Sequence, residues 1–141
     1  MLRLAGQAPS RRSRLSSNVR RRRSTRERIL RAMAIPHAQP GQAVSVKPLG
    51  ARLVQEKTVA LFKSADLEVM RLVLLAGNSL PPHSVPGEIT VQCIEGSIDI
   101  TTEGRSHVLQ AGQLLYLSGG VTHGVIALQD SSALVTVALR K

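Results

Sequence analysis

Two stretches of the chain decide its fold. The first reads Pro81-Pro82-His83-Ser84-Val85-Pro86-Gly87-Glu88-Ile89-Thr90-Val91-Gln92-Cys93-Ile94-Glu95-Gly96. The second reads Gly112-Gln113-Leu114-Leu115-Tyr116-Leu117-Ser118-Gly119-Gly120-Val121-Thr122-His123. In each stretch a histidine lies beside a Gly- or Pro-rich turn and close to a run of aliphatic residues, which is typical of a β-strand bounded by turns. The two histidines are 40 positions apart, so we expect them on different strands.

Strand patterns continue on both sides of these stretches, at the spacing of an all-β domain. The sequence predicts strands over residues 57–63, 67–75, 88–94, 97–102, 105–109, 113–117, 123–128 and 132–139, with a short edge strand near 44–47. Only residues 64–68 hint at a helical turn, and the domain shows no amphipathic helix. The expected fold is therefore an all-β sandwich or barrel of eight or nine strands.

The charge of the chain is concentrated at its start. The formal net charge is +10, and residues 1–32 hold eleven arginines against the single acid Glu27, which is the whole excess. We expect residues 1–32 to be disordered, because their apolar residues are too sparse to offset the entropy of folding. Residues 33–50 are predicted to be an extended lead-in, and residues 51–141 to form the β-domain.

Three interpretations of the arginine-rich segment stay open. It resembles a mitochondrial presequence, it is suited to binding nucleic acid through phosphates, or it is a translated upstream extension with Met33 as the natural start. We expect nucleic-acid binding, if any, to depend on this segment alone. The protein is expected in the cytoplasm, or in mitochondria if it is eukaryotic and residues 1–32 are a presequence.

The composition of the chain excludes several structural features and types of binding site. Cys93 is the only cysteine, which excludes an intrachain disulfide, and the apolar runs are too short to span a bilayer. With one Phe, one Tyr and no Trp, the chain has almost no aromatic platform for stacking bases or sugars. The core must be built from Val, Leu, Ile and Ala.

The two histidine stretches resemble the paired motifs of a small cupin. The first opens with Gly77, five residues and His83, and the second runs from Gly112 through Gly120 to His123. The resemblance implies a jelly-roll barrel, that is, a double-stranded β-helix. It also implies a divalent metal inside the barrel, held by two histidines and a glutamate of the first motif and by one histidine of the second.

Only part of that ligand set is present in this sequence. His83 and His123 match two of the ligands, but Val85 stands where the second histidine is expected. Glu88 lies one residue before the carboxylate position, which Ile89 occupies. Since side chains alternate between the two faces of a strand, this offset of one residue turns the carboxylate away from the interior.

These residues could still form a metal site. His83, Glu88 and His123 form a set that suits iron, manganese, nickel or zinc if a bulge rotates Glu88 inward. Cys93 or, after a shift of register, Gln92 is an alternative third ligand. In the metal-free alternative, the two histidines are hydrogen-bonding groups at the mouth of a pocket.

The expected function is the binding of a small polar or acidic molecule in the barrel, with contacts from His83, Gln92, Tyr116 and His123. The alternative is a metal-free, non-enzymatic cupin that acts as a ligand sensor or structural partner. If the protein is an enzyme, the resemblance implies a metal-dependent oxygenase or isomerase. It also implies a homodimer. His37 and His107 are expected to be solvated.

Overall fold

A computed structural model of the protein describes residues 37–139. The arginine-rich segment 1–32 and the three interpretations of it lie outside the described residues. The regular secondary structure of residues 37–139 consists of nine strands, preceded by the 3-10 helix η1 (Gly50–Gln55). The strands are β1 (Val59–Lys63), β2 (Leu67–Leu74), β3 (Ser79–His83), β4 (Ile89–Glu95), β5 (Ser97–Thr102), β6 (Arg105–Gln110), β7 (Leu114–Leu117), β8 (His123–Ala127) and β9 (Ser131–Ala138).

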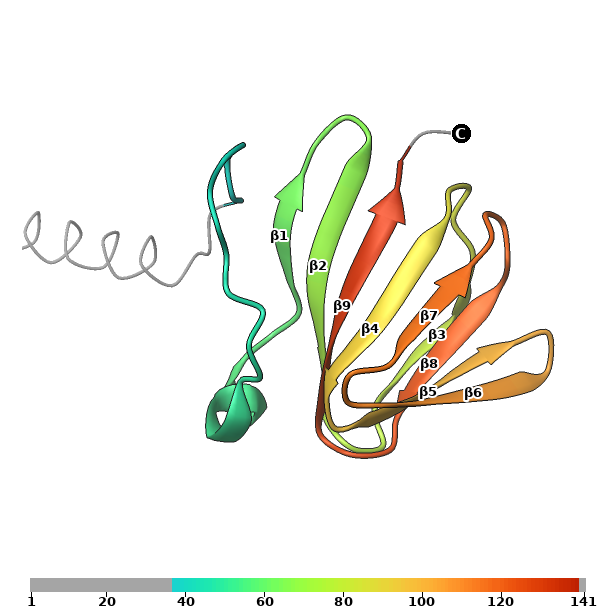
Figure 1. The fold of residues 1–141 in the computed structure, drawn as a ribbon. Coiled ribbons are helices and arrows are strands. Elements are labelled where there is room, and N and C mark those ends of the chain that lie inside the picture. Colours follow the sequence, from blue (N-terminus) through green and yellow to red (C-terminus); the bar gives the residue numbers. More distant parts are fainter. Residues whose placement is uncertain (1–36, 140–141) are drawn as a thin grey trace, which may run out of the picture. The chain divides into compact units, whose positions relative to one another are not determined.

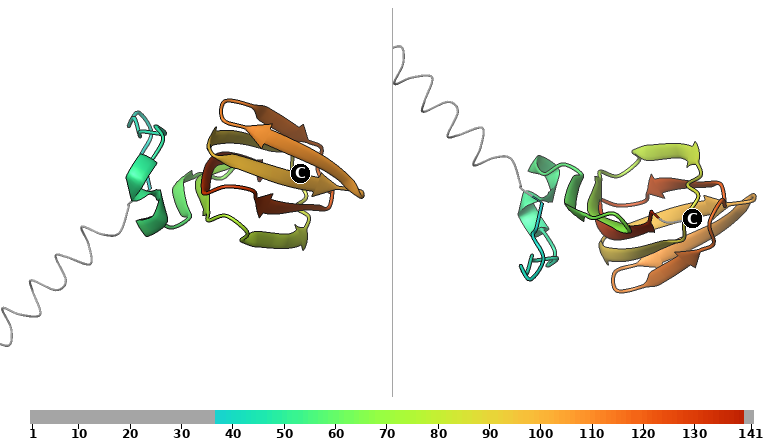
Figure 2. Two further views of the ribbon diagram at one scale, coloured as in Figure 1. Left: turned by 90° about the horizontal axis from the view of Figure 1, so that it is seen from below. Right: turned by 90° about the horizontal axis from the view of Figure 1, so that it is seen from above.

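The strands form two antiparallel sheets that face each other, as Figures 1 and 2 show. Sheet A has the order β1-β2-β9-β4-β7, and sheet B has the order β3-β8-β5-β6. Neighbours in a sheet are mostly not consecutive in the chain, so the chain crosses repeatedly from one sheet to the other. This is the jelly-roll barrel that the sequence predicts, and the fold class is confirmed.

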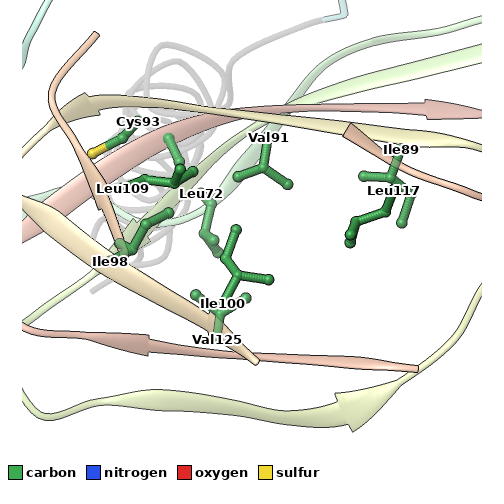
Figure 3. Close-up of a cluster of buried hydrophobic side chains, with 10 residues drawn as sticks. Leu72, Ile89, Val91, Cys93, Ile98, Ile100, Leu109, Leu117 and Val125 are labelled. Carbon is green, nitrogen blue, oxygen red and sulfur yellow. The ribbon is translucent and has the colours of Figure 1, made fainter. Parts of the chain in front are cut away.

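The core lies between the sheets and is aliphatic. Its buried side chains come from alternate positions on both sheets (Figure 3): Leu72, Ile89, Val91, Cys93, Ile98, Ile100, Leu109, Leu117, Val125 and Ala133. Ile98 and Ile100 of β5 are almost fully buried. Burial of one such side chain stabilises the fold by about 1.5–3 kcal/mol, so the alternating pattern determines which face of each strand turns inward.

Three segments differ from the expectation. β3 contains Pro81 and Pro82, and this pair hides the strand in the sequence. β3 is an edge strand of sheet B, where proline is tolerated because one side of the strand needs no hydrogen-bond partner. The helical turn lies at Gly50–Gln55 instead of 64–68, and residues 44–47 are extended without joining a sheet.

The lead-in is attached to sheet A through a buried arginine. Arg71 points to the outer face of the sheet, since its neighbours Met70 and Leu72 line the interior. Its guanidinium donates hydrogen bonds to the carbonyl oxygens of Lys47 (2.7 Å) and Ser45 (3.1 Å). Arg71 is only 6% exposed, so this attachment is shielded from water.

Glu95, at the end of β4, holds the start of η1. Its carboxylate accepts hydrogen bonds from the amides of Leu49 (2.8 Å) and Gly50 (2.9 Å) and from the hydroxyl of Ser132. Burial opposes the charged form. The hydrogen bonds and the positive charge of Arg71 outweigh it and hold the pKa of Glu95 below its usual value. The carboxylate is therefore a structural group.

Candidate functional site

One end of the barrel encloses a cavity of about 310 Å³. Its walls come from the start of β2, the end of β3, the start of β4, the start of β8 and the end of β9. Most of the lining is aliphatic: Met70, Leu72, Leu80, Val85, Ile89, Val91, Val125, Val135, Val137 and Leu139. A volume of this size suits a small molecule, because one water occupies about 30 Å³ in the liquid.

His83 and His123 meet in the wall of this cavity. They are directly opposite each other in the β3–β8 pairing, which brings their ring centroids to 4.5 Å at an interplanar angle of 53°. His123 is 6% exposed, whereas His83 is exposed. The sequence expectation that the two histidines come from different strands is met, and the strand pairing makes them neighbours.

Each imidazole is oriented by the main chain. Nδ1 of His83 lies 3.3 Å from the carbonyl oxygen of Pro81, and Nδ1 of His123 lies 3.0 Å from that of Val121. A carbonyl oxygen only accepts hydrogen bonds, so Nδ1 carries the proton in both rings. In the neutral rings, Nε2 therefore presents a free lone pair on each side chain.

Glu88 lies outside the cavity. Its side chain is exposed, and its carboxylate accepts a hydrogen bond of 2.7 Å from the hydroxyl of Tyr116. This hydrogen bond raises the pKa of Tyr116. Ile89 takes the inward position and is 4% exposed, as the alternation of the strand requires. No bulge turns Glu88 inward, so the structure does not bring it to the two histidines.

The other predicted ligand-binding residues are also placed away from the cavity. Tyr116 is 57% exposed on the outer face of sheet A, and Gln92 has the same outward parity because Val91 points inward. Cys93 is buried in the core, four residues beyond Ile89, and its thiol donates to the carbonyl oxygen of Glu95 (3.5 Å). Burial raises the pKa of the Cys93 thiol, which keeps it in the unreactive form.

The family comparison agrees with this architecture. The family model described as "Cupin domain" matches residues 70–139, which include both histidines and eight of the nine strands in whole or in part. The protein is a small cupin. Among curated proteins, no match to the chain was found.

Solved structures show the same fold. An RmlC-like cupin from Desulfovibrio desulfuricans is 27% identical, with a TM-score of 0.59 over 70% of this chain and 98% of its own. A cupin superfamily protein from Desulfitobacterium hafniense is 16% identical, with a TM-score of 0.62 over 73% and 100%. KdgF from Halomonas sp. is 20% identical, with a TM-score of 0.56 over 60% and 78%.

The side chains of this cupin do not make a complete metal site. Within residues 37–139, no group of three or more His, Cys, Asp or Glu side chains is placed to hold a metal ion. His83 and His123 could offer two nitrogen ligands, and the neighbouring side chains of the cavity wall, such as Val85 and Ile89, are aliphatic and offer none. Catalytic metal sites commonly have three protein ligands. The donor set therefore falls short by at least one ligand.

Sequence reasoning missed a second carboxylate. Glu68 of β2 lines the cavity, since it shares the inward parity of Met70 and Leu72. Its carboxylate lies 3.3 Å from Nζ of Lys63 in the neighbouring strand β1. Glu68 precedes His83 by fifteen residues, and only the packing of the two sheets brings it to the histidine cavity. The alternation of side chains along β2 was the sequence signal that could have placed Glu68 on the inner face.

A further polar pair extends the histidine row across sheet B. Thr102 of β5 is paired with His123, and its hydroxyl oxygen lies 2.8 Å from Nε2 of His107. His107 is half-buried and has the inward parity of Leu109, which corrects the expectation that it is solvated. Polar side chains therefore continue beyond the two histidines on the inner face of sheet B, with Thr102 in the row of His123 and His107 in the next row, opposite Ile100.

Proposed function

We propose that this cupin binds a small molecule in its barrel, with the polar group of the ligand at His83 and His123. The observation that carries the proposal is the cavity of about 310 Å³ beside the paired imidazoles. Ligand sites are typically apolar hollows with a few converging polar groups, and this cavity has that composition. The aliphatic walls indicate that most of the ligand is apolar.

The metal-free alternative from the sequence fits the side chains better than the metallocupin. Two imidazoles without a third protein ligand provide only a weak site for a divalent metal. Of the three ligands predicted for iron, manganese, nickel or zinc, His83 and His123 line the cavity, whereas Glu88 lies outside it. Binding alone suits a sensor or carrier as well as an enzyme.

We further propose a second copy of the chain as the protein partner and the cytoplasm as the location. The single cysteine, Cys93, is a free buried thiol, which suits a reducing compartment. Among the helices of residues 37–139, none has the length and apolar character needed to cross a membrane.

Binding is tested by amide NMR of the full chain with neutral fragments of about seven to nine heavy atoms, such as hexan-1-ol and 2-phenylethanol. We expect shift changes at residues that line the cavity. Val125→Phe fills the cavity and should abolish them, while Ile126→Phe, the adjacent outward position that is 43% exposed, should keep them. Shift changes that are insensitive to Val125→Phe would refute the site.

Metal content is tested by elemental analysis of the full chain after incubation with zinc or nickel and dialysis. We expect metal to be lost on dialysis, because two imidazoles hold a divalent ion weakly without a third protein ligand. The contrary result is near-stoichiometric metal that survives dialysis and is absent from both His83→Ala and His123→Ala. That result would support the prediction that the protein binds a metal through His83 and His123.

A further inference from the structure

The polar side chains that line the cavity are all hydrogen-bond acceptors when the imidazoles are neutral. In both His83 and His123 the proton is on Nδ1, committed to a main-chain carbonyl, so each Nε2 has a lone pair to offer. Glu68 is the third polar side chain of the lining, and an ionised carboxylate only accepts. A ligand for this cavity must therefore donate.

The charge of Glu68 is available to a ligand. Its side chain is 22% exposed, and within residues 37–139 it forms an ion pair with Lys63, whose side chain is 55% exposed. Ion pairs with exposed partners contribute little, about 0–1 kcal/mol, so the lysine can turn outward at small cost. The aliphatic surroundings weaken the screening of the carboxylate, so its charge acts strongly on a cation that takes the place of Lys63.

We propose that the cavity selects a small amphipathic amine. Its ammonium group donates to Nε2 of His83 and His123 and is attracted by Glu68, and its aryl or alkyl body packs among the aliphatic walls. An ammonium group has three N–H donors and a positive charge, which suits acceptors and a carboxylate. An acidic ligand, one of the two classes expected from the sequence beside polar ligands, meets like charge at Glu68 and no side-chain donor in the lining. This inference rests on the proposed function.

The test uses three probes with similar bodies and different polar groups: 2-phenylethylamine, 2-phenylethanol and 3-phenylpropanoate. Each is titrated into the full chain in one buffer at about pH 8, where the amine probe is charged and the carboxylate probe is ionised. Calorimetry gives the dissociation constant, and amide NMR locates the probe. We expect the amine to bind at least about tenfold more tightly than the carboxylate, with the alcohol between them, because charge-assisted hydrogen bonds are the stronger kind.

Glu68→Gln and Glu88→Gln form the matched pair of variants. Each removes one negative charge with almost no change of shape, but only Glu68 lines the cavity, whereas Glu88 is bonded to Tyr116 outside it. We expect Glu68→Gln to weaken the amine about tenfold and to leave the alcohol unchanged. Glu88→Gln should leave the affinities of all three probes unchanged.

The outcomes separate this inference from the proposed function. If 3-phenylpropanoate binds in the cavity as tightly as the amine, the choice of amine is overturned and small-molecule binding stands. If the amine binds most tightly but Glu68→Gln has no effect, the role of Glu68 is overturned. If none of the three probes binds, both the inference and the proposed function fail.

Discussion

At the scale of single residues, the chemistry of this cupin depends on which carboxylates face inward. Glu88 is next to the histidine motif in sequence but lies outside the cavity, because Ile89 takes the inward position. Glu68 is distant in sequence but lines the cavity. Glu95 has a structural role. Its carboxylate accepts three hydrogen bonds, two of them from the amides of Leu49 and Gly50 at the start of η1 and one from the hydroxyl of Ser132.

Glu95 makes the stability of the fold sensitive to acid. Its pKa in the folded protein is lowered, so its stabilising contribution is complete above the usual carboxyl pKa of about 4.3 and is lost as the pH falls through the lower folded value. Glu95→Gln should lower the free energy of unfolding by roughly 1–3 kcal/mol at neutral pH, because hydrogen bonds to a charged group are lost. Urea unfolding at several pH values measures this difference.

The same series of unfolding measurements also tests whether the charge of the Glu95 carboxylate is responsible for the effect. The difference between Glu95→Gln and the wild type should shrink as the pH falls below the usual carboxyl range and through the lowered pKa of folded Glu95. Glu103→Gln, at an exposed turn position, is the control and should match the wild type at every pH. A difference between Glu95→Gln and the wild type that is constant with pH would contradict the assignment.

At the scale of elements, the cavity mouth depends on two loops that touch. The loop between β3 and β4 and the loop between β7 and β8 meet where a Cβ on Gly119 would collide with the carbonyl oxygen of Pro86. The amide of Gly120 donates to the carbonyl oxygen of Val85 across the same contact (2.8 Å). These contacts set the position of the segment that leads into His123.

Adjacent glycines of that loop should respond differently to alanine. Gly119→Ala forces the main chain apart and should cost roughly 2–3 kcal/mol of stability, as overpacking does. Gly120 has a φ of +81° and open space around it, so Gly120→Ala should cost about 1 kcal/mol from backbone strain alone. Denaturant unfolding measures both, and amide NMR should show the His123 region displaced only by Gly119→Ala. Equal effects of the two substitutions would contradict this account.

At the scale of the whole molecule, the outer face of sheet A is the surface best suited to a second copy. Between Glu88 and Glu95, the outward positions of β4, β7 and β9 carry no charge: Thr90, Gln92, Leu114, Tyr116, Leu134 and Thr136. Leu114 is 62% exposed and Tyr116 is 57% exposed. Depletion of charge and exposure of large apolar side chains are typical of the centre of an interface.

The dimer prediction is tested by light scattering after size exclusion. Leu114→Lys should raise the dissociation constant of the dimer at least about tenfold, because it places a charge in the apolar interface. Val108→Lys, a position 47% exposed on the outer face of sheet B, is the matched control and should leave the dimer intact. A monomeric wild type, or equal loss of the dimer in both variants, would refute this interface.

The sequence by itself determined the fold class, most strands and the two histidines. Alternation of apolar and polar residues is a local signal, and it also placed Ile89 inward and Glu88 outward. The local signal did not separate the histidine-bearing strand β3 from a loop, because its two prolines are acceptable only at a sheet edge.

Only the tertiary structure decided what surrounds the histidines. The proximity of Glu68 to the cavity, the inward position of His107 beside Thr102 and the attachment of the lead-in by Arg71 and Glu95 all join segments that are far apart in the chain. The jelly roll pairs strands that are not consecutive, so these contacts depend on how two sheets stack and not on any local pattern. The chemistry of the cavity is set by that stacking.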